Sequence, residues 1–301
     1  MSGDPSTFPV ATSDSTRRPE RVPTREELPP LVARTPLAIV DESVIFLRLA
    51  PGLFLSTALV IMLPMRLIAA AAPGSTLRDA RPDEIVDIFV AYTDHPGAVT
   101  AAFGALFLES IALFTIATTY GQIAASWFAG RSLTATDVLV ASIKRSPLIL
   151  AAWFLVHAAE AIGSIGFMVG LLLPATFFAL AAPIMGAESL GPLESLRRST
   201  RLTRPAFGHV LAVWIVTGVF ALVVRAAIEI VPAVIGLEGL NIPLWLVSGV
   251  ADFVGSVVAA ALIASASVVL YIEQRVRVEG IDLEMAFSTA FPDRSYRVSG
   301  G

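Results

Sequence analysis

The sequence predicts an all-α protein, a polytopic membrane helix bundle of six transmembrane spans in three hairpin units with cytoplasmic interfacial helices. Hydrophobic residues make up 55% of the 301 residues and charged residues only 15%, whereas soluble domains carry about 25% charged residues. The mean hydropathy is +0.75. Six stretches contain the roughly 20 mainly apolar residues that a spanning helix needs. They lie at about 50–71, 100–128, 147–163, 167–187, 207–231 and 244–272.

The chain divides into a membrane domain and two polar tails. Residues 1–33 are rich in Pro, Ser, Thr, Asp and Arg and hold few large apolar side chains. Such a segment buries too little surface to offset the entropy of ordering it, so we expect a disordered cytoplasmic tail. Residues 34–286 form the predicted six-span membrane domain, and residues 287–301 form a flexible C-terminal tail. The chain has no Cys, which excludes disulfides and thiolate chemistry.

Local signals mark the start of the first unit. Thr35 followed by Pro36 predicts a helix start with a side-chain cap and a proline in the first turn. Residues 37–49 are mostly apolar but carry charges, which predicts an interfacial helix before the first span. The connection over residues 72–97 is polar and acidic, and its segment from Asp83 to Tyr92 is a candidate short helix.

The second unit repeats this plan. Thr134 and Asp137 predict a capping box at the start of another interfacial helix. Residues 147–187 are too many for one span and sufficient for two, with a tight turn predicted between Gly163 and Gly166. Pro174 predicts a kink in the fourth span.

A short amphipathic segment precedes each odd-numbered span, so the three units share one order of elements. The sixth span carries a stripe of small residues, Ser256, Ala260 and Ala264, which suits close helix packing. Residue matches between the units are few. A true threefold repeat and a coincidence among Ala- and Leu-rich helices therefore both stay open.

The basic residues are strongly biased to one side of the predicted membrane. Most of the 21 Lys and Arg residues fall in segments 1–50, 129–147, 188–206 and 273–301. The exceptions are Arg66, Arg78, Arg81 and Arg225. Basic residues accumulate on the cytoplasmic side of membrane proteins. The bias therefore predicts a multi-pass protein of the cytoplasmic (inner) membrane with both termini in the cytoplasm.

A basic segment lies between the fourth and fifth spans. Four arginines fall on one side of a helical wheel, and they are Arg197, Arg198, Arg201 and Arg204. Leu193, Leu196 and Phe207 fall on the adjoining side, so we expect a helix along the membrane surface with its apolar face in the lipid. The arginines either anchor the topology or form a surface for anionic lipid headgroups or an acidic partner protein.

Seven polar side chains form a candidate cluster inside the spans, from mid-membrane to the outer end. They are Arg66, Glu109, His157, Glu160, Arg225, Glu229 and Asp252. A charge in lipid costs at least roughly 2.5–3.5 kcal/mol, so these groups should face each other or water. One interpretation is an outward-facing cavity for a polar or anionic ligand, centred on Glu109, Glu160 and Arg225. The other is ion pairing between helices, with snorkelling near the span ends.

Two runs of the sequence resemble a known group of bacterial proteins. E-S-L-G-P-L-E-S-L-R-R-S-T-R-L-T-R begins at Glu188, and L-Y-I-E-Q-R-V-R-V-E-G-I-D-L-E begins at Leu270. Together they are similar to bacterial six-span integral membrane proteins of the glycerophosphoryl diester phosphodiesterase membrane-domain type, without a catalytic domain. The resemblance covers about residues 34–286. It implies the architecture only, because the family has no agreed activity. The chain departs from the family pattern at Thr200, Pro205 and Glu273.

No motif in the sequence supports an enzyme. The three histidines are far apart in the chain, and no metal-binding helix motif, nucleophile elbow or phosphate-binding glycine loop is present. We therefore expect no catalytic residue, no metal, no cofactor and no nucleic-acid partner. The predicted function is a non-enzymatic scaffold or assembly factor that docks anionic lipid headgroups, or a membrane or cytoplasmic partner protein, through its basic surface helices. The alternative is a transporter or binder of a small amphiphilic or anionic solute through an outward-facing polar cavity.

Overall fold

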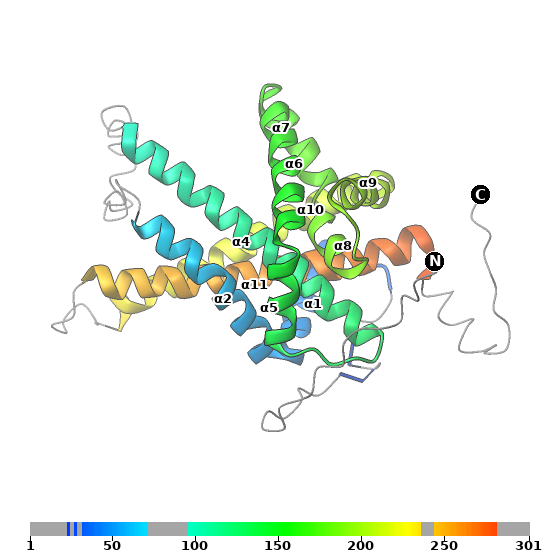
Figure 1. Cartoon of the computed structure of the whole chain (residues 1–301), viewed down its shortest axis with the longest axis horizontal. Helices are drawn as coiled ribbons and strands as arrows, with labels where there is room; N and C mark the ends of the chain where they lie inside the picture. The colour runs from blue at the N-terminus through cyan, green and yellow to red at the C-terminus, as the bar shows by residue number, and fades with distance from the viewer. Residues whose placement is uncertain (1–22, 25–26, 29–31, 72–95, 236–243, 282–301) are drawn as a thin grey trace, which may run out of the picture.

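The computed structural model describes residues 23–24, 27–28, 32–71, 96–235 and 244–281. Every regular element in these ranges is a helix, and six segments are long and apolar enough to cross a membrane. They are Pro51–Ile68, Gly104–Phe128, Ser146–Ser164, Gly170–Ala187, Pro192–Val234 and Leu246–Glu279. The protein is therefore an all-α, polytopic membrane helix bundle, as the composition predicts (Figure 1).

The helices follow the predicted order of short and long segments. They are α1 (Pro36–Leu49), α2 (Pro51–Ala71), α4 (Pro96–Phe128), α5 (Ala135–Lys144), α6 (Ser146–Ser164), α7 (Phe167–Phe177), α8 (Ala181–Ala187), α9 (Pro192–Thr203), the 3-10 turn η3 (Arg204–Ala206), α10 (Phe207–Val234) and α11 (Leu244–Glu279). The short helices α1, α5 and α9 each precede a long one. Two predicted starts are confirmed. Thr35 Oγ1 accepts a hydrogen bond from the Ala38 amide at 3.3 Å, and Thr134 with Asp137 forms a capping box.

Helix α11 is the central helix of the bundle. Its candidate span is 72% buried within the protein, whereas the other five spans are between 17% and 44% buried. The predicted small-residue stripe explains this position, because Ser256, Ala260 and Ala264 are all buried. In a bilayer the hydrophobic effect does not drive helices together. Small side chains favour helix association there because they let the helices approach closely. Helices α1, α2, α4 and α10 all pack against α11.

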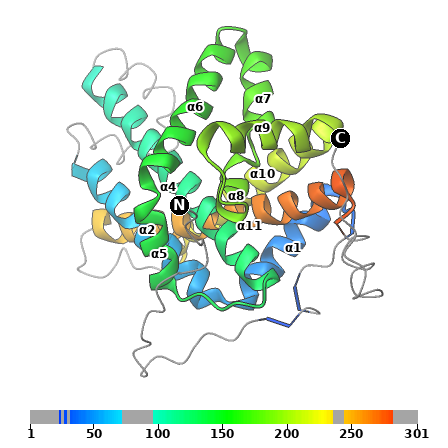
Figure 2. The ribbon, with the colours of Figure 1, turned by 45° about the vertical axis from the view of Figure 1, so that its right-hand side comes forward.

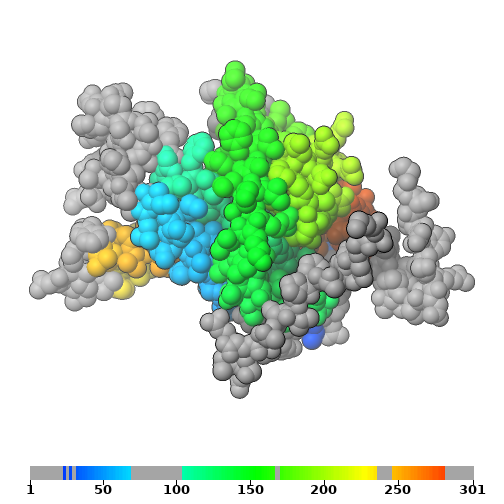
Figure 3. Space-filling model, viewed as in Figure 1, coloured from blue at the N-terminus to red at the C-terminus, as the bar shows by residue number. Residues whose placement is uncertain are grey.

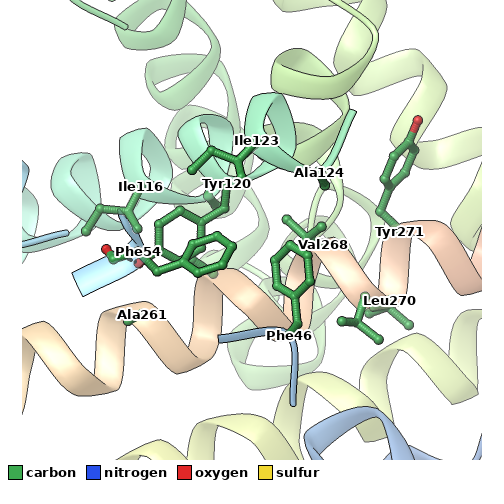
Figure 4. Packing of buried hydrophobic residues seen from close by; sticks show 14 of the residues in the cluster. Phe46, Phe54, Ile116, Tyr120, Ile123, Ala124, Ala261, Val268, Leu270 and Tyr271 are labelled. Atoms are coloured by element: carbon green, nitrogen blue, oxygen red, sulfur yellow. Dashed lines mark hydrogen bonds between the residues drawn. The ribbon is translucent and has the colours of Figure 1, made fainter. Parts of the chain in front are cut away.

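A group of aromatic rings fills the space between α1, α2 and α4. The centroid of the Phe54 ring lies 4.9 Å from that of Phe46, 4.6 Å from Tyr120 and 5.4 Å from Trp127. The buried Tyr120 hydroxyl donates to the Phe54 carbonyl oxygen at 2.7 Å, which satisfies its polar end. Figure 4 shows the rings of Phe46, Phe54 and Tyr120 together with Val268 of α11. The first two spans and the last one therefore share a single core.

Helices α6 and α7 form a hairpin that extends away from α2, α4 and α11 (Figure 1 and Figure 2). Its turn lies where the glycines predict it, because the Gly166 amide donates to the Gly163 carbonyl oxygen at 2.8 Å. The two helices touch through backbone at Gly163 and Gly170, where an added Cβ would overlap the facing carbonyl group. In the space-filling view α6 belongs to a ridge that crosses the visible face (Figure 3).

The fourth predicted span is two helices rather than one kinked helix. Helix α7 ends at Phe177, α8 begins at Ala181, and residues 178–180 form turns between them. Pro174 lies one turn before the break, and its ring prevents the regular hydrogen bond of a helix interior. Helix α8 then packs along α4. This contact is backbone to backbone, because a Cβ added at Gly186 would overlap the Thr118 carbonyl oxygen.

Most of both predicted tails lies outside the described residues, as does the candidate helix between Asp83 and Tyr92. Within residues 1–33 the structure does describe Leu28, which is only 4% exposed and belongs to the main core. This position falls within residues 1–33, which their composition predicts to be a disordered tail. The burial of Leu28 extends the packed part of the chain at least that far toward the N-terminus.

Candidate functional site

Five of the seven polar side chains predicted inside the spans meet in one place, here called the Arg225 cluster. Its members are Arg66 from α2, Glu109 from α4, Arg225 and Glu229 from α10, and Asp252 from α11. Four helices that are distant in sequence therefore each contribute at least one charge. The cluster holds three carboxylates and two guanidinium groups, so its formal charge is negative by one.

Arg225 is the centre of this cluster. Its Nη2 lies 2.6 Å from Asp252 Oδ1, its Nε lies 2.7 Å from Glu229 Oε1, and its Nη1 lies 3.2 Å from Glu109 Oε1. Arg66 completes the arrangement, with Nη1 at 3.2 Å from Asp252 Oδ2 and Nη2 at 3.2 Å from Glu109 Oε2. The Arg66 guanidinium also donates to the Ser256 hydroxyl. Glu109 and Asp252 thus each bridge both arginines, with one carboxylate oxygen on each guanidinium group.

His157 and Glu160 lie apart from the Arg225 cluster. Both are on α6, with His157 Nε2 at 3.9 Å from Glu160 Oε2. The imidazole packs against Trp153, with ring centroids 4.7 Å apart. The seven-residue cluster expected from depth along the spans is therefore wrong in composition. Depth gives the position of a residue along the membrane normal but not its position around the bundle. His157 and Glu160 lie on α6, whose hairpin with α7 extends away from the helices of the cluster.

Helix α9 precedes the start of α10, whereas Arg225 lies in the second half of that helix. At 1.5 Å per residue, Phe207 and Arg225 are about 27 Å apart along the helix axis. Asp252 and Glu273 are about 32 Å apart on α11 by the same measure. Both separations match the roughly 30 Å hydrocarbon thickness of a bilayer. The charged groups of the fifth and sixth spans are therefore spaced to reach both interfaces at once.

Three of the four predicted arginines form an exposed surface, here called the α9 arginine face. Arg197, Arg201 and Arg204 are all exposed. With Thr200 and Pro205 they line an open hollow of about 620 Å³. Among the residues that the structure describes, none of the three arginines forms an ion pair. This surface therefore presents charged N–H donors to the surroundings of the protein.

The fourth arginine, Arg198, does not belong to this face. Its guanidinium binds the Glu188 carboxylate in a fork, with Nε at 3.0 Å from Oε2 and Nη2 at 3.0 Å from Oε1. It also pairs with Glu279 at the end of α11. Tyr271 donates its hydroxyl to Glu188 at 2.8 Å. Arg198 therefore links α9 to α8 and α11. Its guanidinium group is held by partners within the protein, so it stabilises the packing of α9 and is not available to an external ligand.

Helix α9 also packs differently from the expected surface helix. Leu196 is buried in a small core with Ile149 and Met185, so that side of α9 faces protein instead of lipid. Leu193, by contrast, is 57% exposed on the same side as Arg197. Glu194, expected to pair with Arg198, accepts a hydrogen bond from the Gly191 amide at 3.3 Å instead. The carboxylate thus caps the helix start, where it also faces the positive end of the dipole.

A further buried network was not predicted as a site. Glu273 is fully buried on α11 and pairs with Arg277 one turn later. It accepts a hydrogen bond from the Arg34 amide at 3.3 Å and lies 3.5 Å from His209 Nε2. The only signal in the sequence was the i, i+4 spacing of Glu273 and Arg277. These contacts join the segment just before α1 to α10 and α11, at the end of the bundle that carries α9.

Within the described ranges, no group of three or more His, Cys, Asp or Glu side chains is placed to hold a metal ion.

Comparison with known proteins gives no further information about either site. No protein-family model, no curated protein and no solved structure matches this chain.

Proposed function

We propose that this protein is a non-enzymatic, multi-pass scaffold of the bacterial cytoplasmic membrane that docks anionic lipid headgroups through the α9 arginine face. The observation that carries the proposal is the open hollow lined by Arg197, Arg201 and Arg204. Three guanidinium groups without a carboxylate partner in the described part of the chain repel one another unless an anion joins them. Phosphate oxygens suit them, because each guanidinium group offers several N–H donors in one plane.

Lipid is favoured over an acidic protein as the ligand of this face. Leu193 is exposed beside Arg197, and an apolar side chain next to arginines suits the boundary between headgroups and acyl chains. The face also begins where α10 enters its span, so it lies at an interface. An acidic partner protein would leave Leu193 in water or require its own apolar contact there.

The alternative of a solute transporter has less support. That function calls for a wide polar cavity lined by both Arg66 and Arg225. Among the described residues, the hollow beside Arg225 is lined mainly by apolar side chains, and Arg66 is not part of its lining. The charges of the Arg225 cluster bind each other, which favours a structural role in fixing four helices at one depth.

The first test replaces Arg197, Arg201 and Arg204 together with Gln, which keeps side-chain length and helix propensity but removes the charges. Each arginine near an anionic surface contributes roughly 1 kcal/mol, so we expect about a 100-fold loss of affinity for phosphatidylglycerol. The measurement is the number of phosphatidylglycerol molecules retained per protein in mixed nanodiscs after detergent exchange. The variant should still insert with six spans, because the other basic segments keep the orientation.

Two variants serve as controls. The Glu109→Gln and Glu160→Gln double variant removes carboxylates at the other end and should retain the full lipid complement. Replacing Arg197, Arg201 and Arg204 with Lys instead of Gln should keep most of the phosphatidylglycerol retention, because the positive charges remain. If the Gln variant keeps its lipid while the carboxylate variant abolishes uptake of a solute, the transporter function replaces the scaffold. If the Gln variant loses a co-purifying protein but no lipid, the ligand is an acidic partner.

The second test concerns orientation. We propose that both termini face the cytoplasm, since α9, the end of α11 and most basic residues then share the inner side. The chain has no Cys, so single-cysteine reporters are free of background. In intact cells Ser13→Cys and Ser288→Cys should resist an impermeant thiol reagent, and Ser75→Cys should react. Labelling of either tail from outside reverses the assignment.

A further inference from the structure

A groove runs along the side of α10 between the level of the α7–α8 break and the Arg225 cluster. Its longer part, about 350 Å³, is lined by Leu113, Val213 and Leu270, together with Ala179 from the break. Its shorter part, about 180 Å³, ends at Glu109 and Arg225. The two parts adjoin each other, because Leu113, Gly218 and Ile263 line both of them, and together they are treated as one groove. We call it the lateral groove.

The dimensions of the lateral groove suit a chain-like ligand. Val213 and Arg225 are about 18 Å apart along α10, at 1.5 Å per residue. The combined space falls within the roughly 300–1,000 Å³ of small-molecule sites. The walls come mainly from α4, α10 and α11, and they are apolar apart from the hydroxyl groups of Thr217 and Ser267 and the charged end. A narrow apolar trough that lies in the membrane and ends at charges fits an amphiphile with one extended chain.

Glycine at position 218 keeps the groove open. An added Cβ at Gly218 meets no atom within 4 Å, so packing between helices does not require glycine there. Glycine in a helix interior is about 1 kcal/mol less favourable than alanine. Because Gly218 has no side chain, α10 presents only backbone at the point where both parts of the groove meet.

The charged end of the groove determines which headgroup it fits. Within the described part of the chain, Glu229, Glu109 and Asp252 use three of the five N–H donors of Arg225, which leaves one on each terminal nitrogen. The Glu229 carboxylate is 39% exposed and uses one oxygen for Arg225. The cluster as a whole carries one more negative than positive group. It thus provides donors for a phosphate and a carboxylate for a cation, with an excess of negative charge.

We infer that the lateral groove binds one acyl chain of a zwitterionic, amine-bearing phospholipid. The phosphate accepts from the two remaining N–H groups of Arg225, and the ammonium group binds the outer oxygen of Glu229. A net anionic headgroup would bring its charge next to three carboxylates, so it binds less well. This inference does not depend on the α9 arginine face, which lies at the opposite end of α10 and prefers anionic lipid.

The experiment uses the full-length protein in nanodiscs that contain phosphatidylethanolamine with a photoreactive diazirine on its acyl chain. We expect labelling of the α10 segment around Gly218, mapped by mass spectrometry. Gly218→Leu fills the groove and should lower this labelling at least about tenfold. The matched control is Gly208→Leu, which is also an exposed α10 glycine with open space for a Cβ. It should label like the wild type.

The headgroup is tested with an otherwise identical phosphatidylglycerol probe. We expect the ethanolamine probe to label several-fold better in the wild type, and we expect Glu229→Gln to abolish that preference. If Gly218→Leu fails to fold, Ile263→Trp fills the groove from α11 and gives the same comparison. Labelling that does not change when the groove is filled overturns the inference. Equal labelling by the two probes, or loss of a dimer instead of lipid in Gly218→Leu, overturns it as well.

Discussion

Arg225→Ala is expected to lower the free energy of unfolding by about 3 kcal/mol, the value for removing one partner of a buried ion pair. Arg225 contacts all three carboxylates of the cluster, Glu229, Glu109 and Asp252, whereas Arg66 contacts Glu109 and Asp252. Among the described residues, the loss of Arg225 leaves Arg66 as the one cation in a cluster of three carboxylates. The side chain is 29% exposed, so the expected cost is at the lower end of the range for buried pairs.

The measurement is thermal and denaturant unfolding in detergent, followed by tryptophan fluorescence. Arg201→Ala is the matched control, because Arg201 is an exposed helical arginine, and its change should be within about 0.5 kcal/mol. Adding Asp252→Asn to Arg225→Ala should recover part of the loss, since it removes an unpaired negative charge. Equal stability of the Arg225→Ala and Arg201→Ala variants would mean that Arg225 only snorkels to water.

Local features of this fold could be predicted from the sequence because they depend on neighbours in the chain. The capping residues Thr35 and Thr134 act where their spacing predicts. The Gly163–Gly166 turn separates two helices as expected. Span lengths follow from the bilayer thickness and the rise per residue, so apolar composition alone was sufficient to count six of them.

The break after α7 was not predicted because a proline in a helix only kinks it in most membrane proteins. What separates α7 from α8 is the packing of α8 on α4, through glycines at positions 121 and 186. That contact joins residues whose positions in the sequence carry no common pattern. A single sequence therefore shows the weak point at Pro174 but not the direction that the chain takes afterwards.

The charged sites show the same division. On a helical wheel Arg198 is about 100° from Arg197, while Arg201 and Arg204 are within about 40° of it. The wheel thus predicts the α9 arginine face but not the partner of Arg198, which is Glu279 at the end of another helix. Likewise, depth along the spans grouped Arg66 with Asp252 correctly and His157 wrongly. The position of His157 outside the Arg225 cluster follows from the direction of the α6–α7 hairpin, which depth along the span does not give.

Gly186→Ala tests the contact that fixes the broken fourth segment. Alanine normally stabilises a helix by about 1 kcal/mol relative to glycine. At Gly186 the added Cβ overlaps the Thr118 carbonyl oxygen and lies 3.0 Å from the Gln122 amide nitrogen. Both neighbours are backbone atoms of α4, which no side-chain rotation can relieve. Helices α4 and α8 must move apart, and we expect a loss of about 3 kcal/mol, the upper end of the range for overpacked cores.

The opposite sign is expected for the same substitution at Gly218, where an added Cβ meets nothing within 4 Å. Gly218→Ala should raise the unfolding temperature in detergent, whereas Gly186→Ala should lower it. Gly121→Ala should also lower it, because a Cβ at position 121 would overlap the Pro183 carbonyl oxygen. This sign reversal separates backbone contact from helix propensity, since propensity alone gives one sign at all three positions. If Gly186→Ala is as stable as Gly218→Ala, α8 does not pack on α4 through its backbone, and the fourth segment has no need to break at residues 178–180.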